Sequence, residues 1–183
     1  GTVEKTFYFN NPRIETTGDF QVVNFGNTVL SGIPGEPLLP YQEIFLMLSP
    51  GEAAASIDLI EENEIAIPGS IILSPAQHVR PISMGRSGEF IQNKKIYRHD
   101  GIYPVKSTGQ LITQYLNGYA FALSAFTPVR YNPARRQLSY YQKVTVRITT
   151  HSDAESSKAM AHLPVSANIL SRVSSFAQNP EMM

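Results

Sequence analysis

The strictest constraint on the fold is a strand-like alternation of side chains near the carboxyl end of the chain. In residues 137–150, QLSYYQKVTVRITT, apolar and polar side chains alternate. One face would carry Leu138, Tyr140, Val144, Val146 and Ile148, and the other Ser139, Lys143, Thr145, Arg147 and Thr149. A period of two places alternate residues on opposite faces of a β-strand, so this segment is predicted to be a long strand with one face in a hydrophobic core.

The segment that precedes this strand is predicted to be its hairpin partner. An apolar run at residues 119–126 is followed by the turn sequence YNP at 131–133. Asparagine tolerates left-handed backbone and proline fixes φ, so both residue types favour a turn. Arg135 and Arg136 would then lie at the tip of the hairpin.

Shorter candidate strands occur along the rest of the chain, separated by turn sequences such as NNPR, TTGD, SPGE and HDG. They are predicted at residues 6–9, 20–25, 28–30, 43–48, 55–60, 64–67, 71–73, 94–97 and 111–116. Many short strands with regular turns indicate a sandwich or a barrel. The predicted fold class is all-β, an antiparallel β-sandwich of jelly-roll type with a short C-terminal helix.

The end of the chain departs from the strand pattern. Residues 151–162, HSDAESSKAMAH, are polar and without periodicity, which indicates a linker. After them the apolar residues recur at helical spacing before the stop sequence Asn179-Pro180: Val165, Ile169, Val173 and Phe176. The predicted organisation is a β-sandwich at 1–150, a polar linker at 151–163 and a helical segment at 164–183 that either closes the domain or leads to a downstream catalytic domain.

Composition excludes several classes of function. The 15 basic and 15 acidic side chains cancel, so the chain lacks the net positive charge that general nucleic-acid binding requires. No apolar run approaches the ~20 residues of a membrane span. There is no cysteine, which rules out disulfides, thiolate zinc sites and a thiol nucleophile.

Histidines and serines of the sequence show no catalytic pattern. The histidines are not spaced as metal ligands: His78, His99, His151 and His162. The pair His99-Asp100 is interpreted as a turn before Gly101 rather than an acid–base pair, because adjacent strand residues point apart. SMGRSGE at 83–89 lacks the glycine two places after serine that a nucleophile elbow needs, and indicates a loop tip.

Three neighbouring carboxylates, Glu61, Glu62 and Glu64, are the remaining candidate for a cation site. A solvated strand end is the preferred interpretation, because calcium loops arrange their ligands around a tight turn. The sequence therefore predicts no catalytic residue, no metal site and no cofactor.

Three stretches carry a family resemblance. They are GIPGEPLLPYQEIFLMLSPGE at 32–52, IILSPAQHVRP at 71–81, and GIYPVK with FTPVRYNPARRQLSYYQKVTVRI within 101–148. In this order they resemble the N-terminal propeptide of gingipain-type cysteine peptidases, family C25, from secreted Bacteroidetes proteins. The hairpin sequence at 128–133 is the most specific part, and the resemblance extends more weakly into the terminal helix.

The resemblance implies a β-sandwich prodomain that helps a downstream peptidase to fold and keeps it latent. The family's catalytic cysteine and histidine belong to that following domain, which agrees with a cysteine-free chain that is itself non-catalytic. The implied partner is the cognate cysteine peptidase domain of the same precursor. The implied location is secreted, periplasmic or cell-surface, after removal of a signal peptide.

The resemblance also implies that a loop occludes the active-site cleft and offers a basic side chain to the specificity pocket. The corresponding loop is residues 74–95, and the position that matches the family's basic residue falls near Ile82, which is not basic. Arg80 and Arg86 flank it. Arg80 is the preferred candidate because the Arg80–Pro81 bond has no N–H and a rigid φ, and so fills a cleft as a poor substrate. Ile82 is the alternative.

Activation would require the prodomain to be cut away. Lys158 and Arg172 are the nearest basic candidates for the cut. Lys158 is preferred because exposed polar segments are cleaved most easily, and a cut there is expected to release residues 1–158 as a unit.

The competing interpretation is a stand-alone extracellular β-sandwich that acts as a binding or adhesin module. Nine tyrosines would supply stacking surfaces for a carbohydrate. The chain has no tryptophan, the usual sugar platform, and Tyr140 is assigned to the core face.

Overall fold

The structure, a computed structural model, describes residues 1–79, 88–161 and 166–183. Its strands are β1 (Thr2–Tyr8), β2 (Arg13–Thr17), β3 (Phe20–Asn24), β4 (Val29–Ser31), β5 (Leu39–Met47), β6 (Glu52–Ile67), β7 (Ile112–Leu116), β8 (Tyr119–Phe126), β9 (Val129–Asn132) and β10 (Gln137–Ser152). Its helices are α1 (Lys94–Tyr97), α2 (Ala154–Met160), α3 (Ala167–Phe176) and the 3₁₀ helix η2 (Pro180–Met182).

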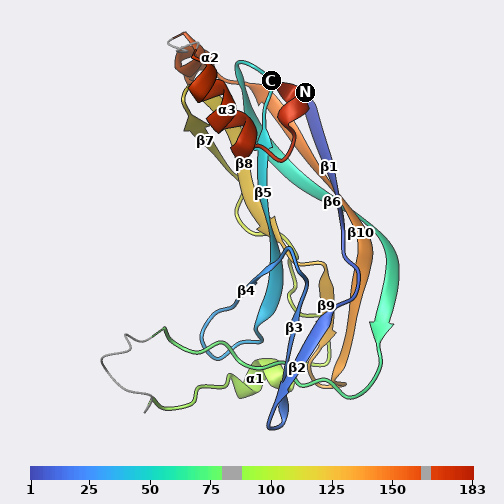
Figure 1. The fold of residues 1–183 in the computed structure, drawn as a ribbon. Helices are drawn as coiled ribbons and strands as arrows, with labels where there is room; N and C mark the ends of the chain where they lie inside the picture. The colour runs from blue at the N-terminus through green and yellow to red at the C-terminus, as the bar shows by residue number, and fades with distance from the viewer. Residues whose placement is uncertain (80–87, 162–165) are drawn as a thin grey trace.

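The strands form two main sheets in which all pairs are antiparallel (Figure 1). One sheet has the order β1-β10-β6, with β9 also paired to β10, and the other has the order β4-β5-β8-β7. β2 and β3 form a separate small hairpin. The prediction of an all-β, antiparallel fold with a short C-terminal helix is confirmed.

The hydrophobic core lies between the two main sheets. Val144, Val146 and Ile148 of β10 are fully buried, as the alternation of that strand predicts. The second sheet contributes Ile44, Leu46, Ala122 and Phe126 to the same core, and β1 contributes Val3 and Phe7. The Phe126 ring meets the Phe7 and Phe9 rings edge-on, with centroids 5.6 and 5.8 Å apart. Aromatic side chains thus join the sheets at the middle of the sandwich.

The hairpin partner of the long strand differs from the prediction. β9 pairs with β10, and the turn between them contains Arg135 and Arg136 as expected. The apolar run of β8 instead joins β5 and β7 in the other sheet. The residues between β8 and β9 are Thr127 and Pro128, and proline has no N–H to continue a ladder, so the chain changes sheets there.

Two segments adopt helix where the sequence indicated otherwise. Residues 94–97 form α1 rather than a strand, because the Asn93 side chain accepts hydrogen bonds from the Lys95 and Ile96 amides and caps a helical turn. Within the expected linker at 151–163, β10 continues to Ser152 and α2 follows at once, with Asp153 as its N-cap. In both segments a helix forms without apolar periodicity, because the capping side chain satisfies amide groups at the start of the helix. The division into three units remains a prediction.

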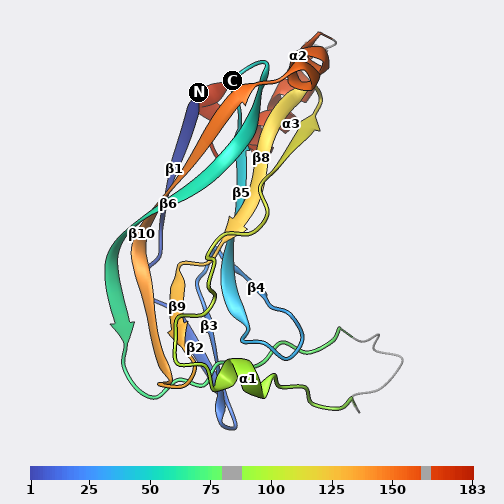
Figure 2. The same cartoon turned by 180° about the vertical axis from the view of Figure 1, so that it is seen from behind.

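The molecule is elongated, and its helices lie at opposite ends of the long axis. α2, α3 and both termini lie at one end, and α1 lies at the other, where residues on both sides of 80–87 run out from the body (Figures 1 and 2). The described residues on both sides of 80–87 and the candidate processing residues are therefore at opposite ends. Among the described residues, no helix has the length and apolar character that crossing a membrane requires.

Candidate functional site: the base of the inhibitory loop and the processing residues

The four residues predicted to enter a protease cleft, Arg80, Pro81, Ile82 and Arg86, lie outside the described residues. The structure instead describes the two limbs that carry them, residues 74–79 and 88–95. These limbs are anchored to the body by a set of hydrogen bonds to three other parts of the chain. The geometry of this anchoring determines how the residues at 80–87 are joined to the body.

Gln77 joins the two limbs directly. Its Nε2 donates to the Ile91 carbonyl at 2.8 Å, and its Oε1 accepts from the Ile91 N–H at 3.0 Å. One side-chain amide thus satisfies both polar groups of a residue 14 positions away, as a strand partner would. Gln77 was not singled out from the sequence, because nothing local marks a glutamine as a cross-loop partner.

Gly35 lies between the limbs and bonds to both. Its N–H donates to the Ala76 carbonyl at 2.7 Å, and its carbonyl accepts from the Asn93 N–H at 2.7 Å. Its φ of +89° is one that L side chains rarely adopt, and an added Cβ would meet Ile91 Cγ2 at 3.0 Å. This position therefore requires glycine. The only sequence signal for it is the dense proline and glycine content of residues 32–40.

Residues 71–77, which lead into the first limb and include its first part, are held to the body along most of their length. The Ala76 N–H donates to the Glu36 carbonyl at 2.8 Å, and the Leu38 N–H donates to the Ser74 carbonyl at 2.9 Å. Residues 71–73, predicted as a strand, form no strand in the structure, and their β pairing is an isolated bridge between Leu73 and Gln21. The proline-rich stretch thus forms the support on which the loop base rests.

Two tyrosines anchor the residues that lead into the first limb. The Tyr131 hydroxyl donates to the Ile71 carbonyl at 3.1 Å and accepts from the Leu73 N–H at 3.2 Å. The Tyr97 hydroxyl donates to the Leu73 carbonyl at 2.6 Å. Burial raises the pKa of both hydroxyls, so they remain neutral donors across the physiological pH range. α1, which carries Tyr97, therefore serves to close the loop base.

The limbs present apolar side chains to solvent. Val79, directly before 80–87, is fully exposed, and Phe90 is 56% exposed while its ring rests on that of Phe20 at a centroid distance of 5.6 Å. These are two separate exposed side chains rather than a continuous apolar patch.

The other sequence candidates have structural partners. Asp100 accepts hydrogen bonds from Arg135 Nε at 2.8 Å and Asn132 Nδ2 at 2.9 Å. Both bonds lower the pKa of Asp100, and the bond from Arg135 has the larger effect. Asp100 therefore ties the β9–β10 turn to the segment after α1. His99 and Asp100 lie in the segment between α1 and Gly101, outside helix and strand, and the interpretation of the pair as a turn stays a prediction.

The three glutamates of β6 are each engaged by β9 or β10. Glu61 pairs with Arg130 at 2.7 Å and Glu62 with Lys143 at 2.8 Å, while Glu64 accepts from the Ser139 hydroxyl at 2.6 Å. In the part of the chain that the structure describes, no group of three or more histidine or carboxylate side chains is arranged to hold a metal ion.

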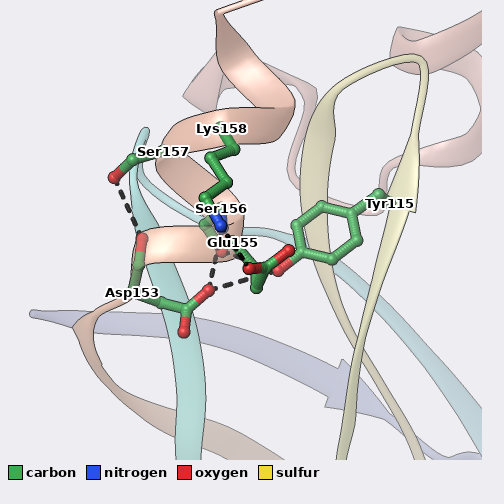
Figure 3. Close-up of polar contacts among 6 residues, drawn as sticks. All are labelled: Tyr115, Asp153, Glu155, Ser156, Ser157 and Lys158. Atoms are coloured by element: carbon green, nitrogen blue, oxygen red, sulfur yellow. Dashed lines mark hydrogen bonds and ion pairs between the residues drawn. The ribbon is translucent and has the colours of Figure 1, made fainter.

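The candidate processing residue Lys158 lies in α2 (Figure 3). Its side chain is 73% exposed, and its Nζ is 2.9 Å from Glu155 Oε1. The helix is capped by Asp153, whose carboxylate accepts from the Ser156 N–H at 2.8 Å; this bond lowers the pKa of Asp153. Ser156 is buried, with its hydroxyl 3.0 Å from that of Tyr115. Lys158 is accessible, but cleavage beside it requires the first turns of α2 to unwind. Arg172 is an exposed residue of α3.

Removing the cap of α2 is expected to accelerate cleavage at Lys158. In Asp153→Ala the Ser156 amide loses its acceptor, so the helix opens more often, and a lysine-specific protease should cut after Lys158 several times faster. The measurement is the rate at which the fragment ending at Lys158 accumulates, followed by mass. Asp153→Asn keeps a capping oxygen and should behave like the wild type; equal rates in all three proteins would contradict the role of the cap.

Comparison with known proteins gives concordant matches in sequence and in structure. The family model of the C25 propeptide matches residues 6–177. A structure described as a complex of Porphyromonas gingivalis RgpB pro- and mature domains matches with a TM-score of 0.73 and 18% identity, over 98% of this chain and 93% of that chain. A structure concerned with the zymogenic latency of gingipain K from Porphyromonas gingivalis matches with a TM-score of 0.66 and 20% identity, over 82% and 87%. No curated protein matches the sequence.

Proposed function

The chain belongs to the C25 propeptide family and is a non-catalytic domain. We propose that it assists the folding of a secreted gingipain-like cysteine peptidase and keeps that peptidase inactive. In this proposal the chain is an intramolecular chaperone and a latency inhibitor that occludes the active-site cleft. Its partner is the catalytic domain of the same precursor, and its location is outside the cytoplasm, at the cell surface or in the periplasm. One structural neighbour is a complex of pro- and mature domains, which is in keeping with such a partner.

The observation that carries the proposal is the anchored base of the loop at 74–95. Gln77 bonds one limb directly to the other, and Gly35 bonds to Ala76 of the first limb and to Asn93 of the second. A loop whose ends are held before binding loses less conformational entropy when it enters a cleft. A rigid base is also what keeps a bound loop from adopting the productive geometry that peptide hydrolysis needs.

Arg80 is proposed as the side chain that enters the specificity pocket, with Pro81 next to it. The Arg80–Pro81 peptide bond has no N–H, so it would lack one backbone donor that a substrate offers to a protease. Arg86 is proposed to contribute a second charged contact, and Ile82 is the apolar alternative for the pocket. Val79 and Phe90 would flank the contact with apolar surface.

Inhibition of the peptidase domain of the same precursor tests the proposal. The wild-type chain is expected to inhibit it tightly, and Arg80→Ala/Arg86→Ala to raise the inhibition constant about ten- to hundredfold, because a charged hydrogen bond contributes ~1.5–3 kcal/mol. The charge-matched control is Lys143→Ala/Arg147→Ala on β10, which should inhibit like the wild type.

Two results would change the assignment. Undiminished inhibition by the double arginine variant, together with a large loss in Ile82→Ala, would place an apolar side chain in the pocket. No inhibition by the wild-type chain would remove the latency role. The chaperone role is measured separately, as the yield of active peptidase refolded with and without the chain; equal yields would contradict it.

A further inference from the structure

One edge of β5 is completed by side chains rather than by a strand. β5 pairs with β8 along residues 42–47, but β4 covers its other edge only at residues 39–41. An open strand edge presents unpaired N–H and C=O groups that attract other chains. Here the groups of Glu43, Phe45 and Met47 are engaged by the segment that follows α3.

Gln178 and Asn179 bond to this edge with the spacing of a strand. The Gln178 side chain accepts from the Phe45 N–H and donates to the Glu43 carbonyl, both at 2.9 Å, and its own N–H donates to the Phe45 carbonyl at 2.9 Å. The Asn179 side chain accepts from the Met47 N–H at 2.7 Å and donates to the Met47 carbonyl at 2.9 Å. Asn179 is almost completely buried. Two side-chain amides therefore replace the ladder of a neighbouring strand.

α3 adds an apolar contact beside the same edge. Val173 is fully buried against Met47 and Phe121, with Ile169 and Leu123 around them. The Phe176 ring packs on those of Phe45 and Phe121, at centroid distances of 4.9 and 5.2 Å. In Figures 1 and 2, α3 lies along β8 and β5 at the end of the sandwich where both termini lie. The segment is thus held by apolar burial and by directional hydrogen bonds at once.

We propose that the edge of β5 and the adjoining apolar surface are a binding site for residues 166–179, which holds this segment without a covalent link. A cut within or just after α2 would then nick the chain and leave its C-terminal segment in place. This differs from the release of residues 1–158 that the sequence led us to expect. The contacts that support retention are those of Val173, Phe176 and Asn179. All three residues follow Lys158 in the sequence, so they would belong to the C-terminal piece and hold it to the sheet after the cut.

The site has a consequence for activation, and this consequence alone rests on the proposed function. A first cut at Lys158 would leave the prodomain attached, through α3, to whatever chain follows Met183. Dissociation would then require a second event, which displaces Gln178 and Asn179 from β5.

The test inserts the recognition sequence of a site-specific protease after Ala161 in the full chain. After complete cleavage, the two pieces are expected to co-elute on size exclusion at micromolar concentration and to separate only in denaturant. In the nicked protein the Phe45 and Met47 amides should remain protected from hydrogen exchange. Separation of the pieces without denaturant, or loss of this protection, would overturn the proposal.

Asn179→Leu, with the same insertion, probes the hydrogen bonds to β5 at nearly constant volume. It leaves both groups of Met47 without a partner, so the C-terminal piece should be held about tenfold or more weakly. Asn168→Leu makes the same change at an exposed position of α3 and should keep the piece bound. Equal retention in both variants would contradict the role of the edge. If Asn179→Leu does not fold, the nicked wild type decides by co-elution and exchange. The peptidase domain of the same precursor is absent from this experiment, so either result is independent of the inhibition assay.

Discussion

Phe126→Ala is expected to lower the free energy of unfolding by about 3–5 kcal/mol, the largest loss of stability that we predict for a single side chain. Phe126 is fully buried at the end of β8, and its ring meets Phe7 of β1 and Phe9 edge-on. Removing it takes away apolar contact between the two sheets and leaves a cavity that rigid β-strands cannot collapse to fill. Chemical denaturation, with the m-value checked for two-state behaviour, measures the change.

Phe90→Ala is the matched control for this prediction. It deletes the same atoms from a side chain that is 56% exposed and touches Phe20 on the surface. Its expected cost is about 1 kcal/mol or less. A loss in Phe126→Ala as small as that of the control would mean that this phenylalanine does not join the sheets as the structure indicates.

Gly35→Val is expected to lower the free energy of unfolding by about 2–4 kcal/mol, from backbone strain at positive φ and from overpacking at the loop base. The new side chain would press on Ile91 Cγ2 and on the Asn93 N–H, which donates to the Gly35 carbonyl. The two limbs of the loop would have to move apart. Amide exchange at Ile91 and Asn93 should accelerate, and under the proposed function inhibition of the peptidase should weaken as well.

Gly18→Val is the control that separates the effect of backbone strain at positive φ from the effect of contact with Ile91 and Asn93. Gly18 also has a positive φ, of +59°, but an added Cβ would meet nothing within 4 Å. It should therefore show the backbone cost without the faster exchange at Ile91 and Asn93. Equal exchange at the loop base in the two variants would contradict the proposal that Gly35 holds the limbs together.

Much of the fold could be predicted from residue patterns because those patterns are local. The alternation in residues 137–150 identified β10 and its buried face, and apolar spacing identified α3. The turn at Arg135 and Arg136 follows from the YNP sequence before it. Such features depend on the period of the backbone and on the φ preferences of single residues.

The segments whose structure differs from the prediction are those for which two local states or two strand neighbours are similar in sequence pattern. β8 is strand as predicted, but its apolar run carries no information on whether β5 or β10 is its neighbour. The helices α1 and α2 have no apolar period, and each depends on one cap, that of Asn93 or Asp153. A short polar helix of this kind is decided by a few hydrogen bonds and by the elements it touches.

Residue patterns and composition were enough to establish the all-β class, the main strand with its core face, the family and the absence of cysteine chemistry. The way in which the loop base and the edge of β5 are completed depends instead on contacts between residues far apart in the sequence. Gln77 meets Ile91, Gly35 meets Ala76, and Asn179 meets Met47 across 132 positions of sequence. A hydrogen bond between distant residues exists only where the packed sheets bring the two groups within about 3 Å in the right direction, and no local pattern encodes that placement.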